Sequence, residues 1–426
     1  MRLLKQTVFY VVALLWIAAP VAGQALPTAT PQQVGLSAEG LERVGPVVQK
    51  FIDDEQVAGA VTIVARRGKV AQFEAYGMMD IDTKKPMQKD TIFRIYSMSK
   101  PITSVAVMML YEEGKLKLDD PASKFLPELK GLKVAEDPGA DEITKVAPKR
   151  EMTVRDLLRH TSGLTYGLFG NTAVDKLYRQ AGVAGRGDGN LQEFVEKLGK
   201  IPLVYQPGAK WNYSVSTDVL GRLVEVVSGR PFDKFLAERI FRPLGMEDTG
   251  FYVPADKLDR FATNYGPKLT GGLTVRDAPA TSRFAKAPKF FSGGGGLVST
   301  AADYMRFCLM LSGKGQFAGK RLLKTETVEL MTRNHLPKEV MPIAFGPAKR
   351  LGVGFGLGFS VRVRQTVWES ASRVGEYGWG GAASTHFWIS PRDELVVVAL
   401  TQYMPFSDRV ERAVKPVVYE AIVEGK

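Results

Sequence analysis

The chemistry and the fold both depend on one stretch, Arg94-Ile95-Tyr96-Ser97-Met98-Ser99-Lys100-Pro101-Ile102. Ser97 is followed three residues later by Lys100, directly before the apolar run 102–110. If this run is helical, the two side chains lie about one turn apart on one face, so the amine can reach the hydroxyl. Pro101 fits a helix start, because the first turn has no intrahelical partners for its backbone N–H groups. The stretch therefore predicts a nucleophilic serine beside a base.

The helix that begins near Ser97 is expected to be buried all round. Residues 102–110 are apolar on nearly every side, and Glu112-Glu113-Gly114 then supplies a polar stop. A serine at its N-terminus gains from the helix dipole, which favours negative charge there. Ser-x-x-Lys also arises by chance in a chain of 426 residues, where it would be an ordinary helix cap beside an ordinary lysine. The interpretation therefore needs support from other stretches.

Composition is that of a globular enzyme. The 426 residues leave room for one large domain or two interlocked ones. The net charge of +12 is scattered, without an arginine-rich arm or a basic helix, so no nucleic-acid partner is expected. Cys308 is the single cysteine and has apolar neighbours, which favour a core position over a catalytic one.

Residues 1–25 have the pattern of a signal peptide. Arg2 and Lys5 precede an apolar stretch at 7–19, and small residues at 21–25 offer a cleavage site. An uncleaved membrane anchor is the alternative, and no other stretch is long and apolar enough to span a bilayer. Export without a disulfide is consistent with a bacterial periplasm or exterior. We therefore expect residues 26–426 to form a periplasmic or secreted domain with no membrane span after cleavage.

Hydrophobic periodicity predicts strands near both ends of the chain and helices between them. The expected strands are at 60–66, 70–77, 384–390 and 394–401. The expected helices are at 38–51, 154–159, 191–198, 219–227, 301–311 and 407–423, the last interrupted at Pro416. This order predicts an α/β fold with an α+β layout, in which one antiparallel sheet is built from both chain ends and flanked by helices. The sheet region spans about 35–95 and 290–420, and a mostly helical second domain, about 100–285, is inserted with the active site at the junction.

Two glycine-rich stretches do not indicate nucleotide binding. In Ser292-Gly293-Gly294-Gly295-Gly296 no lysine follows the glycines as it would in a phosphate loop. The following Thr300 and Asp303 have the pattern of a helix cap. Residues 352–358 alternate glycine with apolar residues, which favours a strand with close backbone approach over a dinucleotide turn.

Two further stretches complement Ser97 and Lys100. Tyr213 lies in Trp211-Asn212-Tyr213-Ser214-Val215, just before an expected helix, where a phenol close to a cationic lysine can accept and return protons. A purely structural tyrosine is the alternative. The second stretch, 378–384, opens a strand that we place at the sheet edge. Its glycines let a substrate lie against the backbone, so that an amide N–H can point at a developing oxyanion.

In order and approximate spacing these motifs resemble the serine β-lactamase-like family, which includes class C β-lactamases, D-Ala-D-Ala carboxypeptidases and family VIII carboxylesterases. The resemblance is carried by Ser97-Met98-Ser99-Lys100, Tyr213-Ser214-Val215 and Trp379-Gly380-Gly381, and by supporting stretches at 157–164, 243–246 and 295–303. It covers residues 35–420, nearly the whole chain.

The resemblance implies a role for each site residue. Ser97 would be the acylated nucleophile and Lys100 its general base or proton relay. Tyr213 would carry the proton to the leaving group. The backbone N–H groups of Ser97 and Ala382 would form the oxyanion hole, and Trp379, Gly380 and Gly381 would line the substrate site. No metal or other cofactor is implied.

Two departures indicate the subfamily. Class C β-lactamases have an asparagine where Val215 stands here, and a lysine where Trp379 stands. Two polar groups for an anionic amide substrate are thus replaced by apolar ones, and Trp-Gly-Gly resembles the family VIII carboxylesterases. We therefore expect an uncharged small-molecule ester with a short or medium acyl chain to contact Val215 and Trp379. Weak β-lactam hydrolysis stays open, because the acylating groups are shared.

Rival functions remain. The same groups would serve a β-lactamase, a D-Ala-D-Ala carboxypeptidase or D-aminopeptidase, an acyltransferase, or a penicillin-binding sensor that acylates once without turnover. An α/β-hydrolase is disfavoured because Gly-x-Ser-x-Gly is absent, and metal hydrolysis because His-Glu-x-x-His is absent. Of the histidines, His160 is expected to be structural, whereas His386 follows the oxyanion stretch and is predicted to line the cleft. The oligomeric state stays open.

Overall fold

The structure is a computed structural model that describes residues 25–184 and 189–423. The predicted signal peptide, 1–25, lies outside this range except for its last residue, and it stays a prediction. Within the described ranges no helix combines the length and the apolarity needed to cross a membrane.

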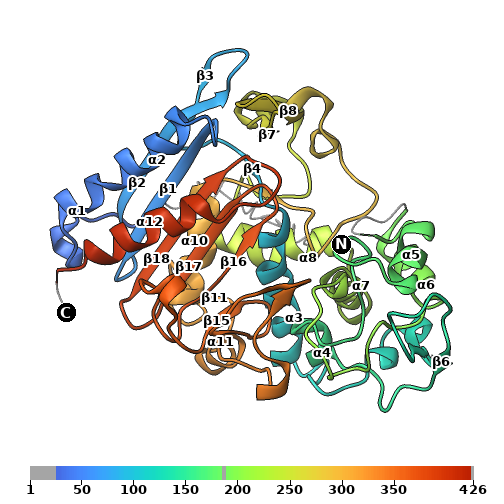
Figure 1. Ribbon diagram of the computed structural model, residues 1–426. Coiled ribbons are helices and arrows are strands. Elements are labelled where there is room, and N and C mark those ends of the chain that lie inside the picture. Colours follow the sequence, from blue (N-terminus) through green and yellow to red (C-terminus); the bar gives the residue numbers. More distant parts are fainter. Residues whose placement is uncertain (1–24, 185–188, 424–426) are drawn as a thin grey trace, which may run out of the picture.

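An antiparallel sheet joins the two ends of the chain (Figure 1). Its eight strands run in the order β14-β15-β16-β17-β18-β1-β2-β3. Their bounds are β1 Gly59–Arg66, β2 Lys69–Asp80, β3 Lys85–Pro86, β14 Val353–Phe355, β15 Ser360–Arg362, β16 Tyr377–Gly381, β17 Thr385–Ser390 and β18 Leu395–Thr401. The first strand pairs with the last, with Ala60 opposite Thr401 and Arg66 opposite Leu395. The predicted sheet built from both chain ends is therefore confirmed.

The central strands β1 and β18 are buried on both faces of the sheet, along their whole length. On β1, Val61 and Ile63 face one core while Ala60 and Val64 face the other, as the two-residue period of a strand requires. Apolar residues are therefore needed at consecutive positions, which is why these strands read as continuous apolar runs.

Helices cover both faces of the sheet (Figure 1). On one face lie α1 (Ala38–Glu42), α2 (Val44–Asp53) and α12 (Arg409–Glu420), around a core that includes Val48, Trp388 and Val414. On the other face α10 (Ala301–Ser312) packs against β1 and β18. Thr300 caps α10 by accepting a hydrogen bond from the N–H of Asp303, as the sequence indicates.

In the long middle section of the chain, helices joined by long loops are the main regular structure. Its helices are α3 Ser99–Glu112, α4 Val154–Leu158, α5 Ala173–Gln180, α6 Leu191–Leu198, α7 Ser216–Ser228, α8 Phe232–Leu236 and α9 Arg242–Leu244. Every residue of α3 from Ser99 to Leu110 is buried, so the expected all-round burial is confirmed. Helix α7 packs against α3.

Several sequence expectations need correction. The helix expected at 38–51 is divided at Arg43 into α1 and α2, and α7 begins at Ser216 rather than at 219. Helix α12 continues through Pro416 instead of being interrupted there. Proline removes one backbone hydrogen bond, but Val414 and Val418 on either side are buried against the sheet and hold the helix together.

Strand β16 was expected at the sheet edge, yet β15 lies outside it. β14 and β15 are only three residues each, too short for a periodic signal. However, β15 pairs with β16 only at Tyr377 and Gly378, so the pairing ends before Trp379. The end of β16 that carries Trp379, Gly380 and Gly381 therefore extends beyond its outer neighbour.

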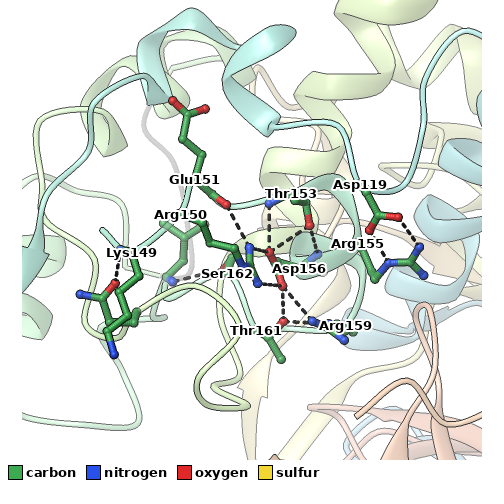
Figure 2. A network of polar contacts seen from close by, with 12 residues as sticks. Asp119, Lys149, Arg150, Glu151, Thr153, Arg155, Asp156, Arg159, Thr161 and Ser162 are labelled. Carbon is green, nitrogen blue, oxygen red and sulfur yellow. Dashed lines mark hydrogen bonds and ion pairs between the residues drawn. The ribbon is translucent and has the colours of Figure 1, made fainter. Parts of the chain in front are cut away.

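A buried carboxylate anchors the loop that follows α4 (Figure 2). Asp156 accepts hydrogen bonds from the Arg150 guanidinium at 3.1 Å, from Arg159 at 3.1 Å and from the Thr161 hydroxyl at 2.7 Å. Burial alone would raise the pKa of Asp156, but the hydrogen bonds from Arg150, from the Thr153 backbone N–H and from Thr161 lower it to about 2. The carboxylate therefore stays charged and ties residues on both sides of α4 together.

Candidate active site

Ser97, Lys100 and Tyr213 meet at the start of α3. Ser97 lies in η2 (Tyr96–Met98), a single 3-10 turn that leads into the helix. The amine of Lys100, in the first turn of α3, is 3.1 Å from Ser97 Oγ. The hydroxyl of Tyr213, which precedes α7, donates to the same oxygen at 2.7 Å. One serine hydroxyl is thus in hydrogen-bond contact with both an amine and a phenol.

The backbone beside the serine is unusual. Tyr96 has φ of 39°, the left-handed region that bulky side chains seldom adopt. Such a residue costs about 1–3 kcal/mol and persists only where its surroundings hold it. Here the Tyr96 ring packs edge-on against Phe284 at 5.7 Å, and the N–H of Ile95 bonds to the Leu297 carbonyl at 3.1 Å. Ser97 itself is partly exposed, whereas Lys100 is buried.

Lys100 has two further partners that sequence reasoning missed. Its amine donates to the Tyr166 hydroxyl at 2.9 Å and to the Gly294 carbonyl at 2.6 Å. Together with Ser97, the amine therefore has three hydrogen-bond partners. Burial, then the nearby Tyr213 and Asp218, raise the pKa of Tyr166 well above its usual range, so this phenol stays neutral. Tyr166 follows the motif at 157–164, but no spacing rule singles it out.

Trp379 contacts the phenol directly. Its indole N–H donates to the Tyr213 hydroxyl at 3.4 Å, and the two ring centres are 5.6 Å apart. Tyr213 lies in an aromatic cluster whose other rings have centres within 6.0 Å of its own: His160, Trp211, Tyr166, Phe169 and Phe345. The phenol is therefore held in place by ring packing as well as by hydrogen bonds.

The glycines of β16 bring that strand against the serine turn. A Cβ atom on Gly381 would stand 2.2 Å from the carbonyl oxygen of Ile95, so only glycine fits this approach. Gly380 and Ala382, on either side, are partly exposed. The structure thus brings the end of β16 beside the start of η2, which is the placement that an oxyanion hole from Ser97 and Ala382 requires.

Two predicted site residues lie elsewhere. Val215 is fully buried, and its backbone N–H donates to the Thr165 carbonyl at 3.3 Å, so it supports the loop that carries Tyr166 instead of offering a contact surface. His386 does not line the site. Its side chain lies on the opposite face of the sheet, where Nδ1 is 2.9 Å from Glu411 of α12. Because successive side chains of β17 point to opposite faces of the sheet, Phe387 lies on the face that carries Trp379 and His386 does not.

His160 is buried beside the site, where its ring packs against that of Tyr213. Its Nδ1 is 3.2 Å from the Ser214 hydroxyl. Burial, together with the charge of Lys100, lowers its pKa well below the usual range. Among residues 25–184 and 189–423, no group of three or more His, Cys, Asp or Glu side chains is arranged to hold a metal ion.

Comparison with known proteins places this geometry in context. The family model described as Beta-lactamase matches residues 45–417. Protein Rv1367c of Mycobacterium tuberculosis (strain ATCC 25618 / H37Rv) is 38% identical over 84% of this chain and 89% of its own length. Esterase EstB of Burkholderia gladioli is 30% identical over 91% of this chain and 98% of its own. Among solved structures, EstCE1, titled a hydrolase with promiscuous acyltransferase activity, aligns with a TM-score of 0.78 at 29% identity, over 89% of this chain and 99% of EstCE1.

Proposed function

This chain belongs to the beta-lactamase family and is a serine hydrolase, and from that premise we propose that it is a carboxylesterase that cleaves short- to medium-chain acyl esters. The observation that carries the proposal is the contact of one hydroxyl with two proton-transfer groups. Ser97 Oγ lies 3.1 Å from the Lys100 amine and 2.7 Å from the Tyr213 hydroxyl. This is the arrangement of a serine nucleophile with its general base and acid.

In the proposed reaction Ser97 is first acylated, and water then removes the acyl group. Lys100 takes the proton of Ser97 as Oγ attacks the acyl carbon, and Tyr213 delivers a proton to the departing alcohol oxygen. The N–H groups of Ser97 and Ala382 hold the negative oxygen of the tetrahedral intermediate. Water then attacks the acyl-enzyme with the same groups acting in reverse. Once protonated, the Lys100 amine keeps acceptors at Tyr166 and Gly294.

The aromatic side chains around Tyr213 support an uncharged substrate. Trp379 contacts Tyr213 where class C β-lactamases would offer a lysine, and Phe345 packs against both rings. Phe169 packs against Tyr213 while 58% of its surface is exposed. Aromatic side chains left partly exposed at a reactive group favour an apolar ligand. That EstB is described as an esterase supports an ester as the substrate.

Acyl transfer is the second candidate. EstCE1 is titled a hydrolase with promiscuous acyltransferase activity and aligns with nearly the whole chain. The aromatic cluster around Tyr213 would also disfavour water relative to an apolar alcohol at the acyl-enzyme. Adding butanol to a p-nitrophenyl butyrate assay tests this: butyl butyrate measured by gas chromatography at the expense of butyrate would support transfer, and butyrate alone would contradict it.

The main test is a kinetic panel on the wild type and on Ser97→Ala. It contains p-nitrophenyl esters of rising acyl length, nitrocefin and a D-Ala-D-Ala peptide. We expect the highest kcat/KM with short and medium acyl esters, weak turnover of nitrocefin, and none of it in Ser97→Ala. Faster hydrolysis of the D-Ala-D-Ala peptide would favour a peptidase, and a single burst of p-nitrophenol without turnover would favour a sensor.

Export is a further part of the proposal. Because residues 1–25 have the pattern of a signal peptide, we expect the enzyme in the periplasm or outside the cell. N-terminal sequencing of the protein expressed with its full chain should find a start near residue 26 in the exported fraction, and an intact Met1 there would contradict the proposal.

A further inference from the structure

The glycine run 292–296 lies against Lys100. Its Gly294 carbonyl accepts a hydrogen bond from the Lys100 amine at 2.6 Å. The neighbouring Gly293 carbonyl accepts one from the Thr103 hydroxyl of α3 at 2.8 Å. Two successive carbonyls of the run therefore bind groups on successive turns of α3, and one of these groups is the amine that contacts Ser97.

A buried carboxylate holds the other side of the run. Asp218 lies in the first turn of α7, with 2% of its surface exposed. Its Oδ1 accepts from the Ser292 hydroxyl at 2.5 Å and from the Gly294 backbone N–H at 3.0 Å. The peptide groups of Gly294 thus connect Asp218, through N–H and carbonyl, to the amine of Lys100.

Steric space explains the glycines in this run. A Cβ on Gly294 would stand 2.7 Å from Asp218 Oδ2 and 3.1 Å from the Tyr166 hydroxyl. A Cβ on Gly293 would stand 2.5 Å from the Thr217 carbonyl. At Gly295, in contrast, the nearest atom would be 3.7 Å away, which is ordinary contact. Side chains are therefore excluded where the run meets Asp218 and Lys100, but not one residue further.

Four titratable groups surround the Lys100 amine. Tyr166 is bonded to it, the Tyr213 ring centre lies 4.6 Å away, and His160 and Asp218 interact with its charge. Burial raises the pKa of Asp218, while the Ser292 bond, the Lys100 charge and the Gly294 bond oppose that rise. Asp218 is the acidic group of this set whose own bonds lead to Lys100.

We propose that Asp218 is a positioning residue, which holds the Ser292–Gly294 turn so that the Gly294 carbonyl aligns the Lys100 amine on Ser97, and which supplies the negative charge beside that amine. This inference rests on the proposed function, in which Lys100 is the base for Ser97. It assigns residues 292–294 of the glycine run to the support of the base.

The test is the pH dependence of Ser97 phosphonylation by an alkyl fluorophosphonate probe in the full-length protein. The variants are Asp218→Asn and, as the matched control, Asp303→Asn. Asp303 is likewise buried in the first turn of a helix, where burial raises its pKa to about 6, but its carboxylate accepts from the backbone N–H of Asp248 and from the Thr249 hydroxyl. If the effect came only from removing a buried carboxylate at a helix start, the phosphonylation rates of both variants would change alike.

We expect Asp218→Asn to lower the plateau rate of phosphonylation by about tenfold or more, as for a misplaced base. The rising limb of its pH profile should move to lower pH, because the variant lacks the buried acid that interacts with the charge of the base. Asp303→Asn should keep the wild-type limb. A limb that does not move in Asp218→Asn, or one that moves equally in both variants, overturns the inference.

A second pair of variants tests the turn itself. Gly294→Ala should lower the phosphonylation rate by about tenfold or more, because its Cβ must displace Asp218 or Tyr166. Gly295→Ala should react at the wild-type rate. Equal rates in the two variants, with near-ultraviolet circular dichroism confirming that both are folded, would contradict the proposal.

The same experiment distinguishes a failure of the proposed function from a failure of the role of Asp218. A wild-type protein that is not phosphonylated on Ser97 would end the proposed function and the inference with it. Phosphonylation that is abolished by Lys100→Ala but unchanged by Asp218→Asn would leave the proposed function standing and refute the role of Asp218.

Discussion

Replacing Tyr213 by phenylalanine removes one oxygen atom from the site. That oxygen donates to Ser97 Oγ at 2.7 Å and accepts from the Trp379 indole at 3.4 Å. Phenylalanine keeps the ring, which packs with Trp211 and Phe345 at centre distances of 6.0 and 5.2 Å. The change therefore removes the proton-transfer group while leaving its aromatic support in place.

The expected cost can be divided between rate and stability. Loss of a general acid-base group lowers kcat/KM by about 10² to 10⁴, which corresponds to about 2.7 to 5.4 kcal/mol in the barrier at about 1.36 kcal/mol per decade. The buried Trp379 N–H also loses its acceptor, which costs about 1–3 kcal/mol of unfolding free energy. The fall in activity should therefore exceed what the modest loss of stability explains.

The assay is kcat/KM for p-nitrophenyl butyrate, with thermal unfolding measured on the same samples. The matched control is Tyr166→Phe, which removes a hydroxyl bonded to Lys100 at 2.9 Å. Because Lys100 keeps Ser97 and Gly294 as partners, we expect a loss of only about tenfold in the control. Near-wild-type activity in Tyr213→Phe would refute its role as proton carrier, and equal losses in both variants would indicate a general disturbance of the site.

The remaining predictions concern the base, the specificity and acid stability. Lys100→Ala should lower kcat/KM for p-nitrophenyl butyrate by about 10² to 10⁴, against complete loss in Ser97→Ala, and near-full activity would show that the base is misassigned. Trp379→Ala should change the relative kcat/KM among acyl lengths more than it changes the common rate, so an equal fall for every ester would count against a role in substrate choice. Asp156, whose pKa falls from 3.8 to about 2 in the folded protein, should contribute about 2 kcal/mol that is present above pH 4 and lost as the pH falls through 2. Urea unfolding of Asp156→Asn and wild type should therefore differ most near neutral pH and converge in acid, and a constant difference would contradict this linkage.

Local patterns were enough for the parts of the fold that lie within one element. The hairpin of β17 and β18 and the buried helix α3 were predictable, because two apolar runs on either side of a turn, and an apolar run with a helix start, can each be recognised locally. The reach from Lys100 to Ser97 was predictable for the same reason, since three residues along a helix correspond to about one turn.

Contacts between elements were decided only by tertiary packing. Gly294 is 194 residues from the lysine that it binds, and Tyr166 is 66 residues away from it. No sequence period relates such positions, because they depend on how α3, α7 and the loop after α4 pack together. The same limit explains His386, which lies beside the oxyanion stretch along the chain but on the other face of the sheet. A sequence specifies spacing along each element, whereas the face and the partner of a side chain follow from the register in which separate elements meet.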